Sequence, residues 1–200
     1  RAEELYQKSL QIRERILGEE HPDTATSYNN LAVVYEEQGE YKRAEELCQK
    51  SLQICEKILG EEHPDTATSY NNLAGIYEKQ GEYKRAEELY QKSLQIRERI
   101  LGEEHPATAT GYNNLAGIYE KQGEYKKAEG LYQKSLQIRE RILGEEHPAT
   151  AVSYNNLAGI YEEQGEYERA EELYQKSLQI RERILGEEHP ATATNCNLNP

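Results

Sequence analysis

The tetrapeptide Glu-Glu-His-Pro combines side chains that could bind a metal ion. It occurs five times, beginning at Glu19 and then every 42 residues. Each copy supplies two carboxylates and one imidazole, which are ligands that zinc accepts. Successive copies should be offset by a helix-packing distance of roughly 10 Å, whereas zinc–ligand bonds are about 2 Å long. We therefore predict no metal site and interpret the motif as a solvated turn, with its acids near the N-terminus of the next helix.

Catalytic chemistry has no motif to support it. The sequence contains no phosphate-binding loop, no dinucleotide-binding fingerprint and no nucleophile elbow. A serine recurs every 42 residues without a histidine nearby on the same predicted helix, at Ser51, Ser93, Ser135 and Ser177. We interpret these serines as small residues that let helices approach closely. No catalytic residue, no cofactor and no enzymatic activity are predicted.

The cysteines predict free thiols. Cys48 and Cys55 are seven residues apart, so on one helix their Cα atoms are separated by about 10 Å. A disulfide requires roughly 4.4 to 6.8 Å. Together with Cys196 they make an odd count, which indicates a reducing compartment, and we expect a cytoplasmic protein.

Pairs of adjacent asparagines are the best candidates for a binding site. They are Asn29 and Asn30, Asn71 and Asn72, Asn113 and Asn114, and Asn155 and Asn156. A side-chain amide donates to a backbone carbonyl and accepts from an N–H group, which suits an extended peptide. Lys79 and Lys121 follow two of these pairs and complete the predicted peptide-binding residues. A second role remains open, in which the asparagines hydrogen-bond between neighbouring helices and hold them together.

The elements that position these residues follow a strict 42-residue repeat. The sequence YNNLA begins at Tyr28, Tyr70, Tyr112 and Tyr154, in step with the Glu-Glu-His-Pro copies. We divide the chain into a half repeat at 1–22, four repeats at 23–64, 65–106, 107–148 and 149–190, and the truncated start of a fifth at 191–200.

Each repeat is predicted to contain two helices, which we call the A helix and the B helix. Tyr28, Leu31, Ala32 and Tyr35 share one face of the first A helix, which can begin at Pro22 and stop before a glycine. The B helix, at about 41–59, is predicted to bury one face made of Tyr41, Ala44, Cys48, Ser51, Leu52, Ile58 and Leu59. No segment alternates with period two. We predict an all-α fold, a right-handed α-solenoid of stacked antiparallel hairpins.

The repeated residues resemble the tetratricopeptide pattern. The positions that carry the resemblance are Tyr28, Leu31, Ala32, Tyr35, Gly39, Tyr41, Ala44, Cys48, Ser51, Leu52 and Pro64. The 42-residue length resembles the repeats of kinesin light chains and nephrocystin-3-like proteins. This resemblance implies a protein-interaction scaffold whose A helices line a concave groove that holds a peptide or helical segment of a partner.

Charge limits the partners. The net charge of −13 argues against nucleic acid and anionic membranes, because both are bound largely through Lys and Arg. No apolar run approaches the ~20 residues that cross a bilayer, so no membrane insertion is expected. The grooves of kinesin light chains resemble cationic clefts that accept acidic peptides. In the predicted groove of this chain, the obvious cations are Lys79 and Lys121. The acids around them are Glu36, Glu37, Glu78, Glu120, Glu162 and Glu163. A neutral or basic partner segment is therefore at least as compatible with this sequence.

Arginines recur in the middle of the apolar face of the predicted B helices, at Arg13, Arg97, Arg139 and Arg181. An unpaired charge there would cost several kcal/mol. We predict that each guanidinium meets a Glu or Asn of an adjacent helix. Cys55 takes this place in the second B helix, so that repeat should lack the contact.

Alternative functions remain beside the binding scaffold. The chain is also compatible with a structural or self-assembling spacer, or with the sensor arm of a larger signalling protein. In the self-assembling case we expect head-to-tail association through the end helices, with Tyr174, Leu178 and Leu185 exposed on the last B helix.

Overall fold

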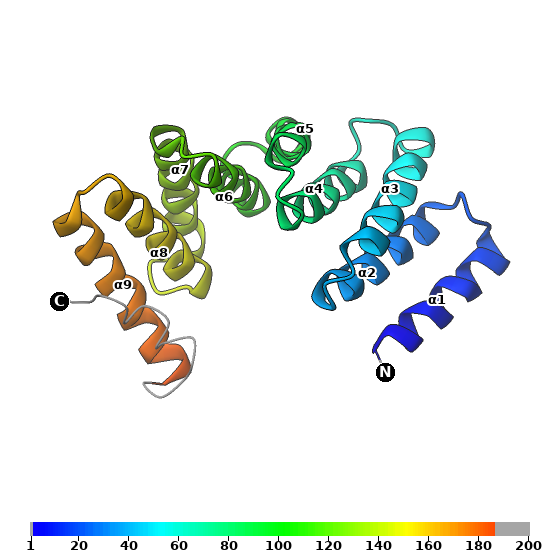
Figure 1. The fold of residues 1–200 in the computed structure, drawn as a ribbon, viewed down its shortest axis with the longest axis horizontal. Helices are drawn as coiled ribbons and strands as arrows, with labels where there is room; N and C mark the ends of the chain where they lie inside the picture. The colour runs from blue at the N-terminus through cyan, green and yellow to red at the C-terminus, as the bar shows by residue number, and fades with distance from the viewer. Residues whose placement is uncertain (1, 187–200) are drawn as a thin grey trace. The chain divides into compact units, whose positions relative to one another are not determined.

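The computed structural model describes residues 2–186, which fold into nine α-helices without a strand (Figure 1). The A helices are α2 (Pro22–Glu37), α4 (Pro64–Lys79), α6 (Pro106–Lys121) and α8 (Pro148–Glu163). The B helices are α1 (Ala2–Leu17), α3 (Tyr41–Ile58), α5 (Tyr83–Leu101), α7 (Tyr125–Leu143) and α9 (Tyr167–Leu185). The predicted all-α fold is confirmed for this part of the chain, and the predicted fifth repeat at 191–200 lies outside it.

Each A helix begins at a proline that follows a histidine. Proline is suited to the first helical position because the N–H group there has no partner within the helix. The preceding His63 is extended, and its Nδ1 accepts a hydrogen bond from the backbone N–H of Asp65 at 3.1 Å. His21, His105 and His147 make the same contact. The histidine of the turn is therefore the N-cap of the A helix, a role that the sequence analysis missed.

The turn from an A helix to a B helix depends on a glycine. Gly39 has a φ of 76°, in the left-handed region where a side chain would be strained. This conformation lets the N–H of Glu40 donate to the carbonyl of Tyr35 at 2.8 Å, which closes the end of α2. The chain then enters α3 at Tyr41 and returns alongside α2.

The buried face of the B helices is close to the predicted one. In α3, Ala44, Cys48, Ser51 and Leu52 are buried as predicted. Ile58 is exposed, which corrects the prediction. It follows Leu52 by six residues, which places it about 120° away around the helix.

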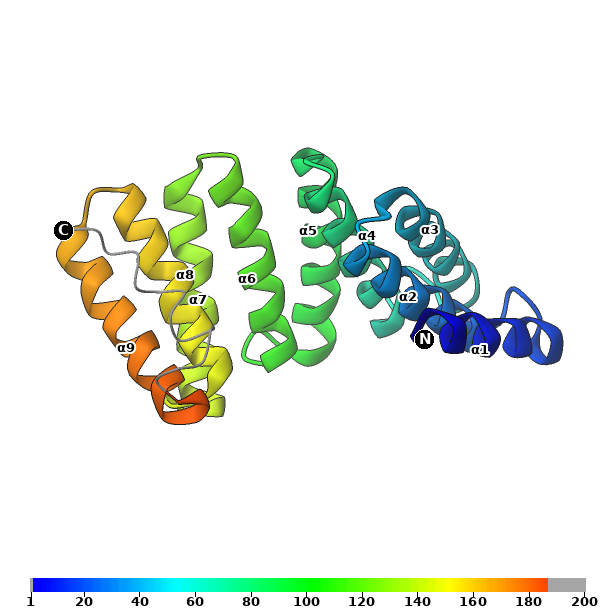
Figure 2. The ribbon, with the colours of Figure 1, turned by 60° about the horizontal axis from the view of Figure 1, so that its bottom comes forward.

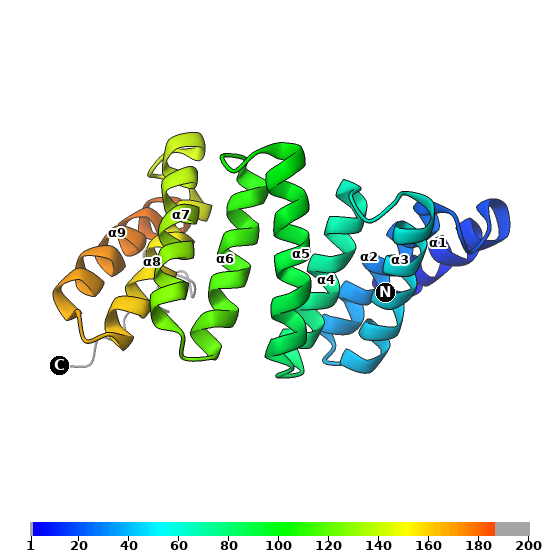
Figure 3. The same ribbon diagram turned by 90° about the horizontal axis from the view of Figure 1, so that it is seen from above.

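Contacts between helices divide the chain into two compact units, and we describe each by itself. The first unit, residues 1–100, holds α1 to α4 and all of α5 but its last residue. Within it, α2 packs against α1, α3 and α4, and α3 also packs against α4. The second unit, residues 101–200, holds the hairpin of α6 and α7 (Figure 3) and the hairpin of α8 and α9 (Figure 2). There α7 packs against α8, so each hairpin covers the next, as in a solenoid.

The core of each unit is made of tyrosine, aliphatic and small residues. Tyr28, Leu31, Ala32 and Tyr35 of α2 are buried, as the period predicted. Ala25 and Ala44 have no exposed surface, which allows close approach of neighbouring backbones. None of the described helices combines the length and apolar character needed to cross a bilayer.

Candidate functional site

The predicted binding residues all lie on A helices but differ in exposure. Asn30, Lys79 and Lys121 are exposed, whereas Asn29 is buried. The remaining asparagines are half-buried, namely Asn71, Asn72, Asn113, Asn114, Asn155 and Asn156. Burial of Asn29 shows that the first asparagine of that pair lies between helices rather than on the free face.

In the second unit an asparagine of one A helix binds an asparagine of the next. Nδ2 of Asn156 in α8 donates to Oδ1 of Asn113 in α6 at 3.0 Å. This contact joins two successive A helices and satisfies the half-buried Oδ1. The stacking role that the sequence left open is therefore present in this pair.

In the first unit the equivalent asparagines are arranged differently. Nδ2 of Asn29 in α2 donates to Oγ of Ser69 in α4 at 3.1 Å, and its Oδ1 is buried without a hydrogen-bond partner. Asn72, which corresponds to Asn156, makes no side-chain hydrogen bond within the described residues. The hydrogen bond that joins the two amides in the second unit is therefore absent here, and we call Asn29 and Asn72 the open amide pair.

An arginine on the B helix accounts for this difference. In the second unit Nη1 of Arg139 donates to Oγ of Ser153 at 2.8 Å and to the backbone carbonyl of Ala149 at 3.0 Å. Arg13 makes the same two contacts with Ser27 and with the carbonyl of Asp23. The predicted Glu or Asn partner is therefore wrong for Arg13 and Arg139. The guanidinium meets a serine and a carbonyl in the first turns of the following A helix, because that is where the middle of the B helix reaches.

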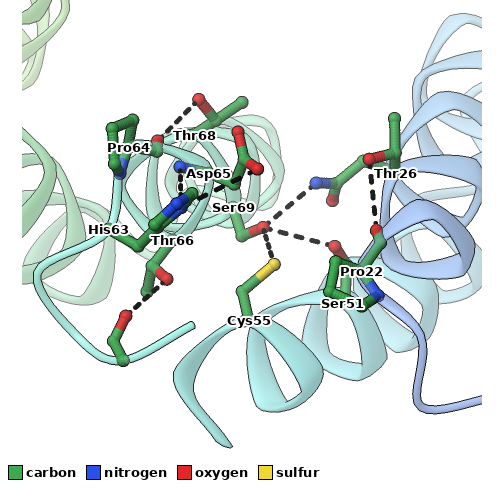
Figure 4. Close-up of polar contacts among 12 residues, drawn as sticks. Pro22, Thr26, Ser51, Cys55, His63, Pro64, Asp65, Thr66, Thr68 and Ser69 are labelled. Carbon is green, nitrogen blue, oxygen red and sulfur yellow. Dashed lines mark hydrogen bonds and ion pairs between the residues drawn. The ribbon is translucent and has the colours of Figure 1, made fainter. Parts of the chain in front are cut away.

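Cys55 replaces the arginine in the second B helix, and this repeat lacks the arginine contact, as expected. Ser69 Oγ contacts Cys55 Sγ at 3.6 Å and Ser51 Oγ at 3.2 Å (Figure 4). The same hydroxyl accepts the amide of Asn29. Because no guanidinium occupies Ser69, Asn29 turns toward this hydroxyl.

Burial shifts the pKa of both Arg139 and Cys55. Removal from water lowers the pKa of the guanidinium of Arg139, a residue that is 7% exposed, because burial disfavours the charged form. Burial raises the pKa of the Cys55 thiol for the corresponding reason, against the hydrogen bonds from Ser69 and Ser51. The site at Arg139 is thus built around a guanidinium, and the site at Cys55 around a thiol whose burial favours its neutral form.

A second repeated contact joins the A-helix glycines to tyrosines of the B helices. A Cβ placed on Gly75 would lie 3.6 Å from the hydroxyl of Tyr90, which donates to Glu78 at 3.1 Å. Gly117 with Tyr132 and Glu120, and Gly159 with Tyr174 and Glu162, repeat the arrangement. In the structure the neighbouring space is taken by a tyrosine hydroxyl.

The first full repeat lacks this contact. Val33 stands in place of the glycine and Cys48 in place of the tyrosine, so the larger A-helix residue faces the smaller B-helix residue. Glu36, the counterpart of Glu78, makes no side-chain hydrogen bond or ion pair within the described residues. The pKa of Glu36 is raised. Its burial is the main cause, and the nearby positive charge of Lys79 offsets part of the effect. The paired replacement of Gly and Tyr was the signal in the sequence that would have identified this site.

The Glu-Glu-His-Pro turns connect successive repeats. Besides its N-cap histidine, each of the four turns that the structure describes supplies a glutamate that pairs with a lysine or arginine on the following B helix. Glu20 pairs with Lys57 at 2.7 Å. Glu62 with Arg99, Glu104 with Arg141 and Glu146 with Arg183 are the equivalent pairs. No group of three His, Cys, Asp or Glu side chains arranged for a metal ion occurs among residues 2–186.

Comparison with known proteins identifies this architecture. The sequence profile of the tetratricopeptide repeat matches residues 1–47, 29–99, 69–141, 108–183 and 153–196. No curated protein sequence gives a significant match. Among solved structures, BtubC (BKLC) from P. vanneervenii is 30% identical with a TM-score of 0.80, covering 94% of this chain and 75% of that one.

Two other similar structures show the same fold. A Podosopora anserina protein assigned to the kinesin light chains, with nearly identical TPR-like repeats, is 30% identical with a TM-score of 0.73, covering 92% of this chain and 87% of that one. Apo RapI has a TM-score of 0.74 at 23% identity, covering 88% of this chain and 63% of that one, and supports the fold alone. The chain therefore belongs to the tetratricopeptide repeat family, and its repeats are similar to those of kinesin light chain-like proteins.

Proposed function

We propose that this chain is a non-catalytic scaffold that binds an extended or helical segment of a partner protein along its A helices. Its membership of the tetratricopeptide family supports a role in protein interaction. The resemblance to kinesin light chain repeats, which implies a groove lined by A helices, points to these helices as the binding elements.

One observation carries this proposal, namely the polar side chains that the A helices leave available. Asn30, Asn72 and Asn155 make no side-chain hydrogen bond within the described residues, although Asn72 and Asn155 are half-buried. Lys79 and Lys121 are exposed two turns further along α4 and α6. Such amides and cations fit the alternating donors and acceptors of a peptide backbone. The predicted site is thus proposed for these residues, while Asn29, Asn113 and Asn156 also hold helices together.

The experiment compares binding and stability in the same variants. The full chain is screened against a randomised peptide library, and enriched peptides are titrated by fluorescence anisotropy. Asn72→Ala and Asn155→Ala should weaken binding by about tenfold with little change in Tm, because each removes a free amide. Asn156→Ala is the matched control, and it should lower Tm because it removes the contact with Asn113. A library that yields no enriched peptide would refute the scaffold function.

We also propose a cytoplasmic location. Cys48 and Cys55 are buried free thiols, which suits a reducing compartment. Fractionation of cells that express a tagged chain would test this location, and recovery in an oxidising compartment would contradict it.

A second candidate function, self-association, is favoured by α1. Residues 2–17 are identical in sequence to residues 86–101 of α5, yet Leu5 and Ile12 of α1 are 63% and 50% exposed. In α5 the counterpart of Ile12, Ile96, is buried.

We propose that α1 packs on α9 of a second copy, where Tyr174 and Leu178 are half-buried; the side chain of Leu185 lies outside the described residues. Sedimentation should show concentration-dependent association that Leu5→Glu with Ile12→Glu abolishes, and a monomer at high concentration would exclude it.

A further inference from the structure

We propose that the α2–α4 face of the first unit is a selective site for a partner segment that carries a lysine or arginine side chain. This inference rests on the proposed scaffold function and adds to it a location and a ligand chemistry. It depends on two neighbouring polar groups that are satisfied elsewhere in the chain and unsatisfied here, and on an apolar side chain that lies between them.

The first group is the open amide pair of Asn29 and Asn72. Only 9% of Asn29 is exposed, and its Oδ1 has no hydrogen-bond partner. In the second unit the equivalent oxygen, on Asn113, accepts the amide of Asn156. A buried polar atom without a partner costs free energy. A peptide N–H that binds the side-chain carbonyl of Asn72, and so brings the Nδ2 of Asn72 closer to this oxygen, would remove this cost.

The second group is the carboxylate of Glu36. Its counterparts Glu78, Glu120 and Glu162 each accept a hydrogen bond from a tyrosine hydroxyl. Glu36 has no such donor because Cys48 replaces the tyrosine, and its oxygens make no other hydrogen bond or ion pair within the described residues. A charged donor supplied by a ligand would pair with a carboxylate that is already half removed from water.

The third group is Val33, which lies between the other two on α2. It is 43% exposed, whereas the glycines at this position in the later repeats offer no side chain. Asn29, Val33 and Glu36 are separated by four and three residues, so they follow one face of α2 over about 10 Å. Lysine and arginine have apolar stems that pack on such a residue while the charged end reaches further.

Charge favours a basic ligand at this face. Glu36, Glu37 and Glu78 are opposed by Lys79, which is exposed and makes no ion pair within the described residues. The local charge is therefore negative, although Lys79 weakens its attraction for a cation. An acidic segment would meet three carboxylates and one lysine, and its binding is disfavoured.

Both cysteines of α3 contribute to the unsatisfied groups of this face. Cys55 replaces an arginine, releases Ser69 and thereby draws the amide of Asn29 away from Asn72. Cys48 replaces a tyrosine and leaves Glu36 without a donor. The two substitutions act on separate groups, and both groups lie on the same face of α2 and α4.

The test uses the full chain and peptides enriched from a randomised library. Each enriched peptide is synthesised in its original form and with its basic residues changed to glutamine, and both are titrated by fluorescence anisotropy. We expect enrichment of Lys and Arg over Asp and Glu, and about tenfold weaker binding after the change to glutamine. Glu36→Gln should weaken the binding of the basic peptide similarly. Glu162→Gln in the second unit is the matched control and should leave its binding unchanged.

A repaired chain separates binding from folding. Val33→Gly with Cys48→Tyr copies the later repeats and should give Glu36 its tyrosine, and Cys55→Arg should restore the contact with Ser69. The repaired chain should melt no lower than the original chain and bind the basic peptide about tenfold more weakly. Equal binding by the repaired chain, or enrichment of peptides regardless of charge, would overturn the site while the scaffold function stands. A library without any enriched peptide would instead overturn the scaffold function itself.

Discussion

At the scale of single residues, the buried guanidinium of Arg139 depends on a serine hydroxyl. Ser153→Ala removes one of its two described acceptors and leaves a buried charge less well paired. We expect a loss of about 1–3 kcal/mol in the free energy of unfolding, measured by urea denaturation. The exposed Thr110, whose hydroxyl binds only the nearby Pro106 carbonyl, provides the control Thr110→Ala. A loss no larger than that of the control would show that the serine does not support the arginine.

The thiol of Cys48 provides a second test at this scale. Burial raises its pKa from 9.0 to about 12, with a smaller contribution from the negative charge of Glu36. The folded chain thus holds this proton at pH values where the unfolded chain releases it. The contribution of this thiol to the free energy of unfolding is therefore fully present below about pH 9, and it is lost as the pH rises toward 12.

This shift predicts slow labelling of the folded chain. In a Cys196→Ser background, a thiol reagent such as DTNB at pH 8 should react with the two thiols of α3 far more slowly in buffer than in urea. Cys48→Ala should also lessen the fall in Tm between pH 9 and 11. Rapid labelling under native conditions would contradict the burial of both thiols.

At the scale of helices, the histidine caps fix where the A helices begin. His147→Ala removes the acceptor for the N–H of Ala149, and we expect a loss of about 0.5–2 kcal/mol in the free energy of unfolding. His147→Asn should restore most of it, because asparagine also caps helices. Equal losses for alanine and asparagine would assign the effect to some other property of the imidazole. Urea denaturation of the three chains provides the measurement.

Helix positions were predictable from the sequence because they depend on local rules. The proline at the start, the glycine at the end and the apolar period located α2 and α3 nearly to the residue. The partners of Arg13 and Arg139 were not predictable, because they depend on which turn of the next A helix the guanidinium reaches. The hydrogen-bond partners of the asparagines could not be predicted for a related reason. Their sequence is the same in both units, and their hydrogen bonds depend on buried residues of another helix.

At the scale of the whole molecule, ion pairs between turns and B helices connect repeat to repeat. Glu20 and Lys57 are both largely exposed, so their pair contributes little, about 0.2–1 kcal/mol. Glu20→Lys should lower Tm slightly, and Glu20→Lys with Lys57→Glu should restore it. Raising the salt concentration should reduce the difference between the single variant and the original chain. A double variant as unstable as the single one would show that the pair contributes no attraction.

The cysteines of α3 carry a consequence for how duplicated repeats diverge. Asn29 and Asn72 have the same identities as Asn113 and Asn156, yet their hydrogen bonds differ because of a residue hidden on the B helix behind them. On the proposed function, a repeat can thus acquire a new binding preference while its asparagines stay unaltered. Comparing only the exposed positions of such arrays would group together repeats that recognise different partners. Engineering can use the same property, since a change at the buried position 55 should adjust how these asparagines are hydrogen-bonded.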